Sequence, residues 1–494
     1  MSEIHLLTTP NSVTLWWELP AQPPALYEVW LDGTSCCTVR CTHVTLEDLV
    51  PGTDHRVQVK SVGEVRFSTP QPKQRLDVTA APYFAVGDGK TMNRAALQRA
   101  LDDCGPDQVI YFPAGVYLTG GLTGHGDTEI YLEEGAVLQG SGCPEDYLPR
   151  IPSRFEGIEM ECYQSLLNFG YLDHTAGPNC KRVRIHGKGT IRGGGYPLAW
   201  GTIQSERERL KEEWAAMADL VRTCENENTI PGRVRGRLIN LSNCEDVRIS
   251  GLTLADGASW NVHMIYSRNI VTDHCTFRSE GIWNGDGWDP DSSENCTLFG
   301  CTFYTQDDSV AIKSGKNPEG NRIGRPTRRV RVFDCRSAFG HGVCIGSEIS
   351  GGIEDVAVWD CDLTNSQYGL LVKGTAKRGG GVQGLTVRRC ALPRVMVCQV
   401  GYNDDGVPGP RPPIFREMLF EDLTLTGRCL DADQALDGGQ GGGFAPCVPI
   451  QLEGFDGAGY ELQDVTLRRI ALAGGGTVQL ARCKGVSLED VRTV

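Results

Sequence analysis

The sequence of 494 residues lacks several features that would assign it to a membrane or nucleic-acid-binding class. No apolar run approaches the roughly 20 residues needed to cross a bilayer. The opening MSEIHLLTTPNSVTLWW has neither the basic end nor the unbroken apolar block of a secretion signal. Excess positive charge is also missing, and a net charge of −14 would repel nucleic acid and anionic membranes, so neither is expected as a partner. We therefore predict a globular protein of the cytoplasm.

Paired cysteine motifs are missing too, although the chain contains 20 cysteines. Five of them share one place in a recurring pattern, as in NCTLFGCTF and DVAVWDCDL: Cys275, Cys301, Cys335, Cys361 and Cys390. Further copies of the pattern hold Leu252, Leu423 or Ile470 at that place. A position that accepts Leu, Ile or Cys is a buried apolar position, so these thiols are predicted to be free and packed in a core. Free thiols suit a reducing compartment, and disulfides or metal binding are the alternatives.

The same pattern is an internal repeat that determines the predicted fold. Its core positions each open a short alternating strand that ends in a polar or Gly-rich turn: Val183, Val247, Ile270, Cys296, Val330, Val356, Leu385, Met418, Val465 and Val486. Between Val247 and Leu385 the steps are 23, 26, 34, 26 and 29 residues. Short strands at such a period, with 61 glycines and little helical patterning, predict an all-β right-handed parallel β-helix over residues 76–494.

Two segments depart from the repeat. NRAALQRALDDCG, residues 93–105, has the 3.6-residue period of an amphipathic helix and is predicted to cover the N-terminal opening of the solenoid. The charged stretch SERERLKEEWAAMADLVRTCENEN, residues 205–228, is predicted to be a helical surface excursion from one coil, with a substrate lid as the alternative.

The first 75 residues follow a different pattern. SVTLWWEL, LYEVWLDG, CCTVRC and DHRVQVKSV alternate as the strands of an antiparallel sandwich do, and STPQPKQR follows them as a Pro-containing linker. LEDLVPGTDHRVQV resembles the turn and strand that close a fibronectin type III module, with His55 at the usual tyrosine position. Residues 1–75 are therefore predicted to form a small fibronectin type III-like β-sandwich domain.

A concentration of carboxylates marks the candidate site, in NGDGWDPDSSENCTLFGCTFYTQDDSVAIKSG (residues 284–315). Asp307 follows Asp286 by 21 residues, close to one repeat, so a solenoid would place the two on adjoining coils. Asp308 and Asp289 add charge nearby, and repulsion among stacked carboxylates raises the proton affinity of at least one. One acid can then stay protonated beside an ionised base, as glycoside hydrolysis requires. Turn-capping aspartates and a calcium site are the alternatives for this cluster.

Neighbouring motifs favour catalysis. NGDGWDPDSS, TQDDSVAIKSG, FGHGVCIGSEISGG and YGLLVKGTAKRGG occur in the order and approximate spacing of the polygalacturonases, glycoside hydrolase family 28, which this chain resembles. The resemblance covers most of residues 76 to about 400, and GSEISGG is similar to the exo-acting bacterial branch of the family. It implies an inverting hydrolase that removes galacturonic acid units from pectic oligosaccharides, which would be the partner of this protein.

The resemblance also implies roles for individual residues. The family's Asn-Thr-Asp motif stands here as Asn284-Gly285-Asp286, so Asp286 would be a base carboxylate. In the paired motif, Asp307 matches the general acid and Asp308 the second residue that activates water, and His341 of Gly-His-Gly would tune the acid. The residues expected to bind substrate are Asn284, Lys313, Glu348, Lys373 and Arg378. No cofactor and no metal ion is expected.

One departure from the family concerns substrate choice. The family's Arg-Ile-Lys motif stands here as Leu371-Val372-Lys373, and leucine cannot replace the bidentate grip of a guanidinium on a carboxylate. Lys313, Lys377 and Arg378 are candidates for the missing positive charge. A galacturonidase acting on rhamnogalacturonan fragments is therefore an alternative function. A calcium-dependent pectic lyase and a non-catalytic carbohydrate-binding β-helix are more distant ones.

Overall fold

A computed structural model describes residues 3–216, 218–219, 234–402, 406–432 and 442–494. It divides the chain into two compact units, Met1–Gln74 and Arg75–Val494, each of which has its own hydrophobic core. The C-terminal part of the charged segment 205–228 lies outside the described residues.

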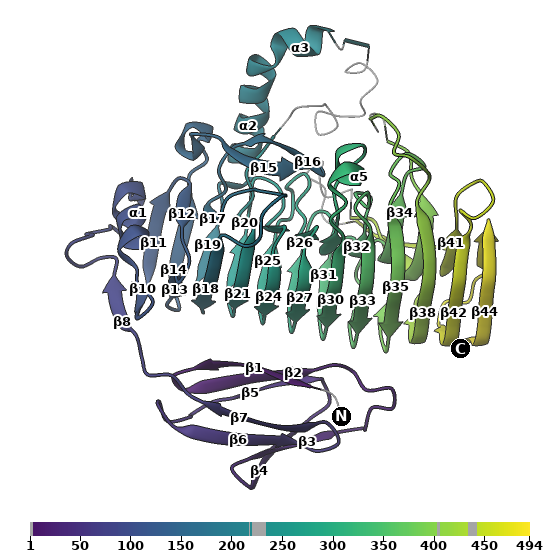
Figure 1. Ribbon diagram of the computed structural model, residues 1–494, viewed down its shortest axis with the longest axis horizontal. Coiled ribbons are helices and arrows are strands. Elements are labelled where there is room, and N and C mark those ends of the chain that lie inside the picture. The colour runs from purple at the N-terminus through teal and green to yellow at the C-terminus, as the bar shows by residue number, and fades with distance from the viewer. Residues whose placement is uncertain (1–2, 217, 220–233, 403–405, 433–441) are drawn as a thin grey trace. The chain divides into compact units, whose positions relative to one another are not determined.

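The N-terminal unit is a sandwich of two antiparallel sheets (Figure 1). One sheet has the order β1-β2-β5 and the other β4-β3-β6-β7. The strands are β1 (Ile4–Thr9), β2 (Ser12–Trp17), β3 (Tyr27–Leu31), β4 (Thr34–Val39), β5 (His43–Leu46), β6 (Asp54–Val59) and β7 (Gly63–Ser68). Trp17 and Tyr27 are fully buried, with ring centroids 5.1 Å apart, and they fill the space between the sheets. His55 bonds Asp32 and Thr53 through its two ring nitrogens.

The second unit is a right-handed parallel β-helix, as the repeat predicted, and all of its described strands except those of two hairpins stack into three parallel sheets (Figure 1). We name each sheet after one of its strands. The β18 sheet contains β8 (Gln74–Asp77), β10 (Gln108–Phe112), β13 (Glu129–Leu132), β18 (Cys180–Gly187), β21 (Cys244–Ser250), β24 (Arg268–Asp273), β27 (Glu294–Phe299), β30 (Thr327–Phe333), β33 (Ile353–Trp359), β35 (Gly381–Arg388), β36 (Ala391–Leu392), β38 (Ile414–Leu425), β42 (Leu462–Leu472) and β44 (Cys483–Thr493).

The other two sheets follow in each coil. The β19 sheet contains β9 (Asp88–Met92), β11 (Gly115–Thr119), β14 (Ala136–Gly140), β19 (Thr190–Arg192), β22 (Thr253–Ala255), β25 (Thr276–Arg278), β28 (Thr302–Tyr304) and β31 (Arg336–Phe339). The β20 sheet contains β12 (Leu122–Gly124), β17 (Leu167–Phe169), β20 (Ile239–Ser242), β23 (Val262–Ile265), β26 (Trp288–Asp291), β29 (Val310–Ile312), β32 (Gly342–Ile345), β34 (Gly369–Gly374), β37 (Arg394–Gln399), β41 (Ile450–Glu453) and β43 (Val478–Ala481).

The register of the coils follows the repeat. In the β18 sheet Val183 pairs with Val247, and Val247 pairs in turn with Ile270. The series of paired partners then runs on through Cys296, Val330, Val356, Leu385, Met418, Val465 and Val486. Equivalent residues therefore stand side by side on successive coils, which is the relation that the candidate site requires.

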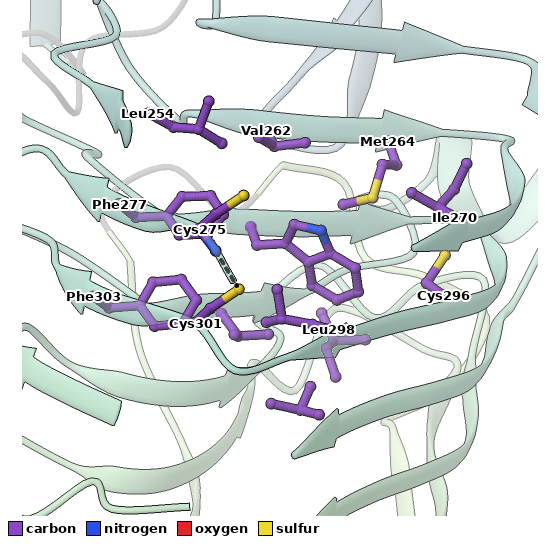
Figure 2. Close-up of a cluster of buried hydrophobic side chains, with 14 of the residues drawn as sticks. Leu254, Val262, Met264, Ile270, Cys275, Phe277, Cys296, Leu298, Cys301 and Phe303 are labelled. Carbon is purple, nitrogen blue, oxygen red and sulfur yellow. Dashed lines mark hydrogen bonds between the residues drawn. The ribbon is translucent and has the colours of Figure 1, made fainter. Parts of the chain in front are cut away.

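The interior of the solenoid contains the cysteines of the repeat. Cys275 and Cys301 are almost fully buried, and the Cys275 backbone N–H lies 3.4 Å from the Cys301 sulfur (Figure 2). Phe277 and Phe303 stack beside them with centroids 4.6 Å apart. Every cysteine that the structure describes is free. The predicted buried, apolar setting of these thiols is confirmed.

Helices and two hairpins interrupt the coils. The amphipathic helix predicted within residues 93–105 is α1 (Arg94–Asp103), which buries Leu97, Ala100 and Leu101 in the solenoid core. The other helical segments are η1 (Pro144–Tyr147), α2 (Gly195–Arg209), α3 (Lys211–Ala216) and α5 (Glu319–Ile323), and the hairpins are β15 (Ile151–Phe155) with β16 (Ile158–Cys162) and β39 (Arg428–Leu430) with β40 (Phe444–Pro446). None of the helices within the described ranges is long and apolar enough to cross a membrane.

Candidate active site

The predicted catalytic residues lie in three successive turns that lead into the β20 sheet. Asp286 precedes β26, Asp307 and Asp308 precede β29, and His341 precedes β32. Main-chain hydrogen bonds connect these turns: Gly287 N–H donates to Asp308 O at 2.9 Å, and His341 N–H donates to Asp307 O at 3.1 Å. Coil stacking therefore brings together residues that are up to 55 positions apart in the chain.

Glycines give these turns their shape. Gly340 and Gly342, on either side of His341, have φ angles of 136° and 96°, which favour glycine. A methyl group on Gly340 would lie 2.4 Å from Thr305 Oγ1, and one on Gly285 would lie 2.7 Å from Ile282 O. The glycine that replaces the family's threonine is thus required by the tight turn that precedes Asp286.

Asp308 is held as an anion. It is buried, and its carboxylate lies 3.1 Å from both Lys373 Nζ and His341 Nδ1. Burial alone would raise the pKa of Asp308, but the charge of Lys373 and the His341 hydrogen bond outweigh burial and hold the pKa well below its usual range. His341 Nδ1 also lies 3.1 Å from Asp307, whose side chain is 28% exposed against 2% for Asp308. Of the two neighbours, Asp307 is the one that a ligand can reach.

The pKa of Asp286 is shifted in the opposite direction to that of Asp308. Burial, reinforced by the charge of Asp307, raises its pKa to about 8, although Lys313 lies 3.4 Å away. Asp289 in β26 is fully buried and 4.0 Å from Lys313, and burial with the charge of Asp286 raises its pKa as well. The site therefore combines a carboxyl group that tends to keep its proton with a carboxylate that stays ionised.

The predicted substrate-binding residues are only partly brought together. Lys313 contacts Asp286 and lies 3.6 Å from Glu348, so both belong to the cluster. Burial would lower the pKa of Lys313, but Glu348 and Asp286 raise it well above its usual value. Arg378 lies elsewhere: it is buried, and its guanidinium donates to Asn317 Oδ1 at 2.6 Å and to Ser347 O at 3.0 Å. Its charge acts on Glu348, whose pKa is lowered against the effect of burial mainly by Lys313 and then by Arg378.

Asn284 and Leu371 border the site. The Asn284 side-chain oxygen accepts a hydrogen bond from buried Arg235, which orders the turn before Asp286. Leu371 is only 3% exposed and packs with Cys344 and Cys398 in an apolar cluster. The position of the family's arginine is thus occupied by a core side chain, and Lys373 is the cation of that motif that reaches the aspartates.

Buried arginines around the site were not predicted from the sequence. Arg154, on the β15–β16 hairpin, lies 2.8 Å from Asp291 of β26, whose second oxygen is 3.3 Å from His263. Burial would raise the pKa of Asp291, but Arg154 and His263 hold it at about 2. The Arg237 guanidinium lies 4.9 Å from the Phe155 ring and 4.8 Å from the Trp260 ring, and Lys313 also lies 4.8 Å from the Trp260 ring. No repeat or motif signals that the hairpin residue Arg154 folds back onto β26.

These features define a class of protein. A reachable carboxyl group, an anionic carboxylate and a third, proton-retaining carboxyl group lie in adjoining turns, and Lys313 and Lys373 contact two of them. Glycosidases cleave their substrates with such a pair of groups, one acting as acid and one as base, so the class indicated is that of the glycoside hydrolases.

Comparison with known proteins gives the family. The model for glycosyl hydrolases family 28 matches residues 170–400. The chain is 31% identical over 373 residues to a probable polygalacturonase of Vitis vinifera, covering 70% of this chain and 69% of the relative. It is 27% identical over 413 residues to an exo-poly-alpha-D-galacturonosidase of Dickeya chrysanthemi, covering 77% and 68%. This protein belongs to glycosyl hydrolases family 28 and is a glycoside hydrolase.

A solved structure supports the fold. The family 28 exopolygalacturonase of Yersinia enterocolitica superposes with a TM-score of 0.81, covering 100% of this chain and 96% of its own, at 20% sequence identity. At this identity the likeness concerns the fold alone.

Proposed function

We propose that this protein is an inverting, exo-acting hydrolase that releases galacturonic acid from pectic oligosaccharides. The observation that carries the proposal is the arrangement of Asp286, Asp307 and Asp308 around His341, Lys313 and Lys373. The names of the Dickeya and Vitis relatives support galacturonate as the sugar.

The chemistry assigns one task to each aspartate. Asp307, the more exposed group, gives its proton to the glycosidic oxygen as the C1–O bond breaks. Asp308, kept ionised by Lys373 and His341, takes a proton from the water whose oxygen forms the new bond to C1. The family motif implied that Asp286 is a base carboxylate, but burial raises its pKa to about 8. We therefore assign it a different role, in which the protonated carboxyl group holds that water by a hydrogen bond. Lys313 and Lys373 would face the carboxylate of the sugar.

The test is a product profile from trigalacturonate and from polygalacturonate. We expect monogalacturonate to appear first from both substrates, with no unsaturated sugar and no need for calcium. Long internal fragments would refute exo action, and an ultraviolet-absorbing product would refute hydrolysis. A parallel assay on rhamnogalacturonan oligosaccharides measures the consequence of Leu371, because a neutral sugar needs no guanidinium partner.

Two finer proposals accompany this one. The strand orders β1-β2-β5 and β4-β3-β6-β7 support a fibronectin type III module in the N-terminal unit, which a solved structure of residues 1–75 would test. The row of buried free thiols supports a cytoplasmic location, where the enzyme would meet imported fragments. Cell fractionation that finds the protein outside the cytoplasm would refute this location.

A further inference from the structure

Three aromatic rings, two exposed and one half-buried, lie next to the catalytic turn. Tyr196 and Trp200, one helical turn apart on α2, stack with an interplanar angle of 3° and a centroid distance of 6.5 Å. Trp283 lies 5.4 Å from Tyr196 and 5.8 Å from Trp200. Tyr196 is 50% and Trp200 37% exposed, even though α2 buries Leu198 and Ile203 elsewhere on its surface. We call Tyr196, Trp200 and Trp283 the aromatic platform.

The platform is continuous with the active site. Trp283 precedes Asp286 by three residues, and buried Arg235 donates to the Trp283 carbonyl at 2.9 Å and to the Asn284 side chain. Gly281 N–H donates to Gln306 Oε1 at 2.9 Å, which ties the same turn to the next coil. Trp283 is therefore held by the same turn as Asp286, and Tyr196 and Trp200 contact its ring. A molecule that contacts both the rings and the carboxylates would gain from a preorganised spacing.

A hollow of about 530 Å³ adjoins the platform at Tyr196. This volume is within the range of small-molecule sites. Its polar lining comes from the β19 sheet and the turns around it, and consists of Gln139, Arg192, Asp256 and Glu280. Apolar ring faces beside amide, guanidinium and carboxylate groups suit a sugar ring, which has one apolar side and a rim of hydroxyl groups.

The charged side chains around the hollow are paired with groups of opposite sign. Asp256 lies 3.7 Å from Arg192, and Glu280 lies 2.6 Å from Arg278. Each carboxylate of the lining thus already has a cation beside it, so no unpaired cation is left to bind the carboxylate of a uronic acid. Sugar hydroxyl groups could still form hydrogen bonds with both the donors and the acceptors of the lining. The hollow therefore favours an uncharged sugar.

We propose that the aromatic platform and its hollow form a second subsite, which binds a neutral pentose or hexose residue of the same oligosaccharide while the galacturonate occupies the aspartate cluster. This inference rests on the proposed function for its substrate class. It makes the enzyme selective for pectic fragments that carry neutral sugars.

The first test compares two substrates in the full-length protein: trigalacturonate, and a galacturonate oligosaccharide of equal length that carries one neutral sugar. For Trp200→Ala we expect kcat/KM on the substituted substrate to fall about tenfold more than on trigalacturonate, mainly through KM, because one stacking contact is lost. Trp200→Phe should restore most of the difference. Tyr171→Ala removes an aromatic side chain that is 65% exposed outside the platform, and should change neither value.

Equal losses on the two substrates would overturn the proposal, since the platform would then only support the catalytic turn. No loss on either would overturn it as well. An equal loss on unsubstituted hexagalacturonate would show that the rings bind uronate, and would refute the neutral-sugar assignment.

A second test does not depend on turnover. Arabinotriose and galactotriose are titrated against the full-length protein while tryptophan fluorescence is recorded. We expect saturable quenching with at least one of them, weakened about tenfold in Trp200→Ala and unchanged in Asp307→Asn. Absence of quenching by both sugars would contradict the subsite even if galacturonate release is found. Quenching without any galacturonate release would leave the subsite standing and refute the proposed function instead.

Discussion

The interior of the coils and the turns that lead into the β20 sheet differ in what they require of a residue. Inside, the place filled by Cys275 and Cys301 is filled by Leu252, Leu423 or Ile470 in other coils, and all five side chains are buried. In the turns, Asp286 and Asp308 stand on neighbouring coils, yet burial raises the pKa of one while Lys373 and His341 lower that of the other. The interior needs only apolar volume, whereas the function of each turn residue depends on its particular partners.

The largest expected effect is on turnover. Asp307→Asn should lower kcat by about 10³-fold or more, because an amide cannot protonate the leaving oxygen. Unfolding should change little, since Asp307 is partly exposed. Rates of galacturonate release and thermal unfolding curves are the measurements. Asp355→Asn, which removes a 55% exposed carboxylate on the β18 sheet, is the matched control and should leave kcat unaltered. Comparable losses in both variants would contradict the assignment.

Asp308→Asn should impair both activity and stability. Lys373 would keep a buried charge without its carboxylate, at a cost of about 3 kcal/mol at pH 7. Because the folded pKa of Asp308 is lowered, its stabilisation is present above the ordinary value of 3.8 and is lost as pH falls below it. The deficit of the variant should therefore shrink on acidification, as denaturant titrations can measure. Asp308→Asn with Lys373→Met should regain part of the stability, and failure to do so would argue against the ion pair.

Asp286→Asn should stabilise the protein at high pH, whereas Asp308→Asn should destabilise it. The native carboxyl has a pKa raised from 3.8 to about 8, so the stability it contributes is complete below 3.8 and is lost as pH rises towards 8. The variant cannot ionise, and it should exceed the native protein by about 1 kcal/mol or more at pH 9. Because the amide resembles the protonated acid, its kcat should fall about tenfold, far less than for Asp307→Asn. Equal stability of the two proteins from pH 4 to 9 would contradict the raised pKa.

The smallest expected effect is that of a substitution in the interior of the solenoid. Cys301→Val should cost less than about 1.5 kcal/mol and leave kcat unchanged, because the slot requires only an apolar group of similar volume. Urea unfolding and the galacturonate assay check both parts. A large loss of activity would show that interior and site are coupled, and the contrast between them would fail.

The internal repeat in the sequence was enough to predict the strand pairing, the buried positions and the proximity of the aspartates. The pairing from Val183 to Val486 and the burial of the five cysteines follow from the repeat, and stacking then places Asp286 near Asp307. It did not predict contacts made by segments outside the repeat. Arg154 reaches Asp291 from the β15–β16 hairpin, and Arg378 turns towards Asn317 and Ser347 instead of the aspartates. Such contacts depend on how the segments between the repeats are folded. These segments have no sequence period from which their contacts could be predicted.

The most direct test of the whole account is the configuration of the first product. Proton NMR during hydrolysis of α-linked trigalacturonate should show β-galacturonate appearing first and the α-anomer only later by mutarotation, because water attacks the face opposite the leaving oxygen. Initial α-galacturonate would contradict an inverting arrangement of Asp286, Asp307 and Asp308.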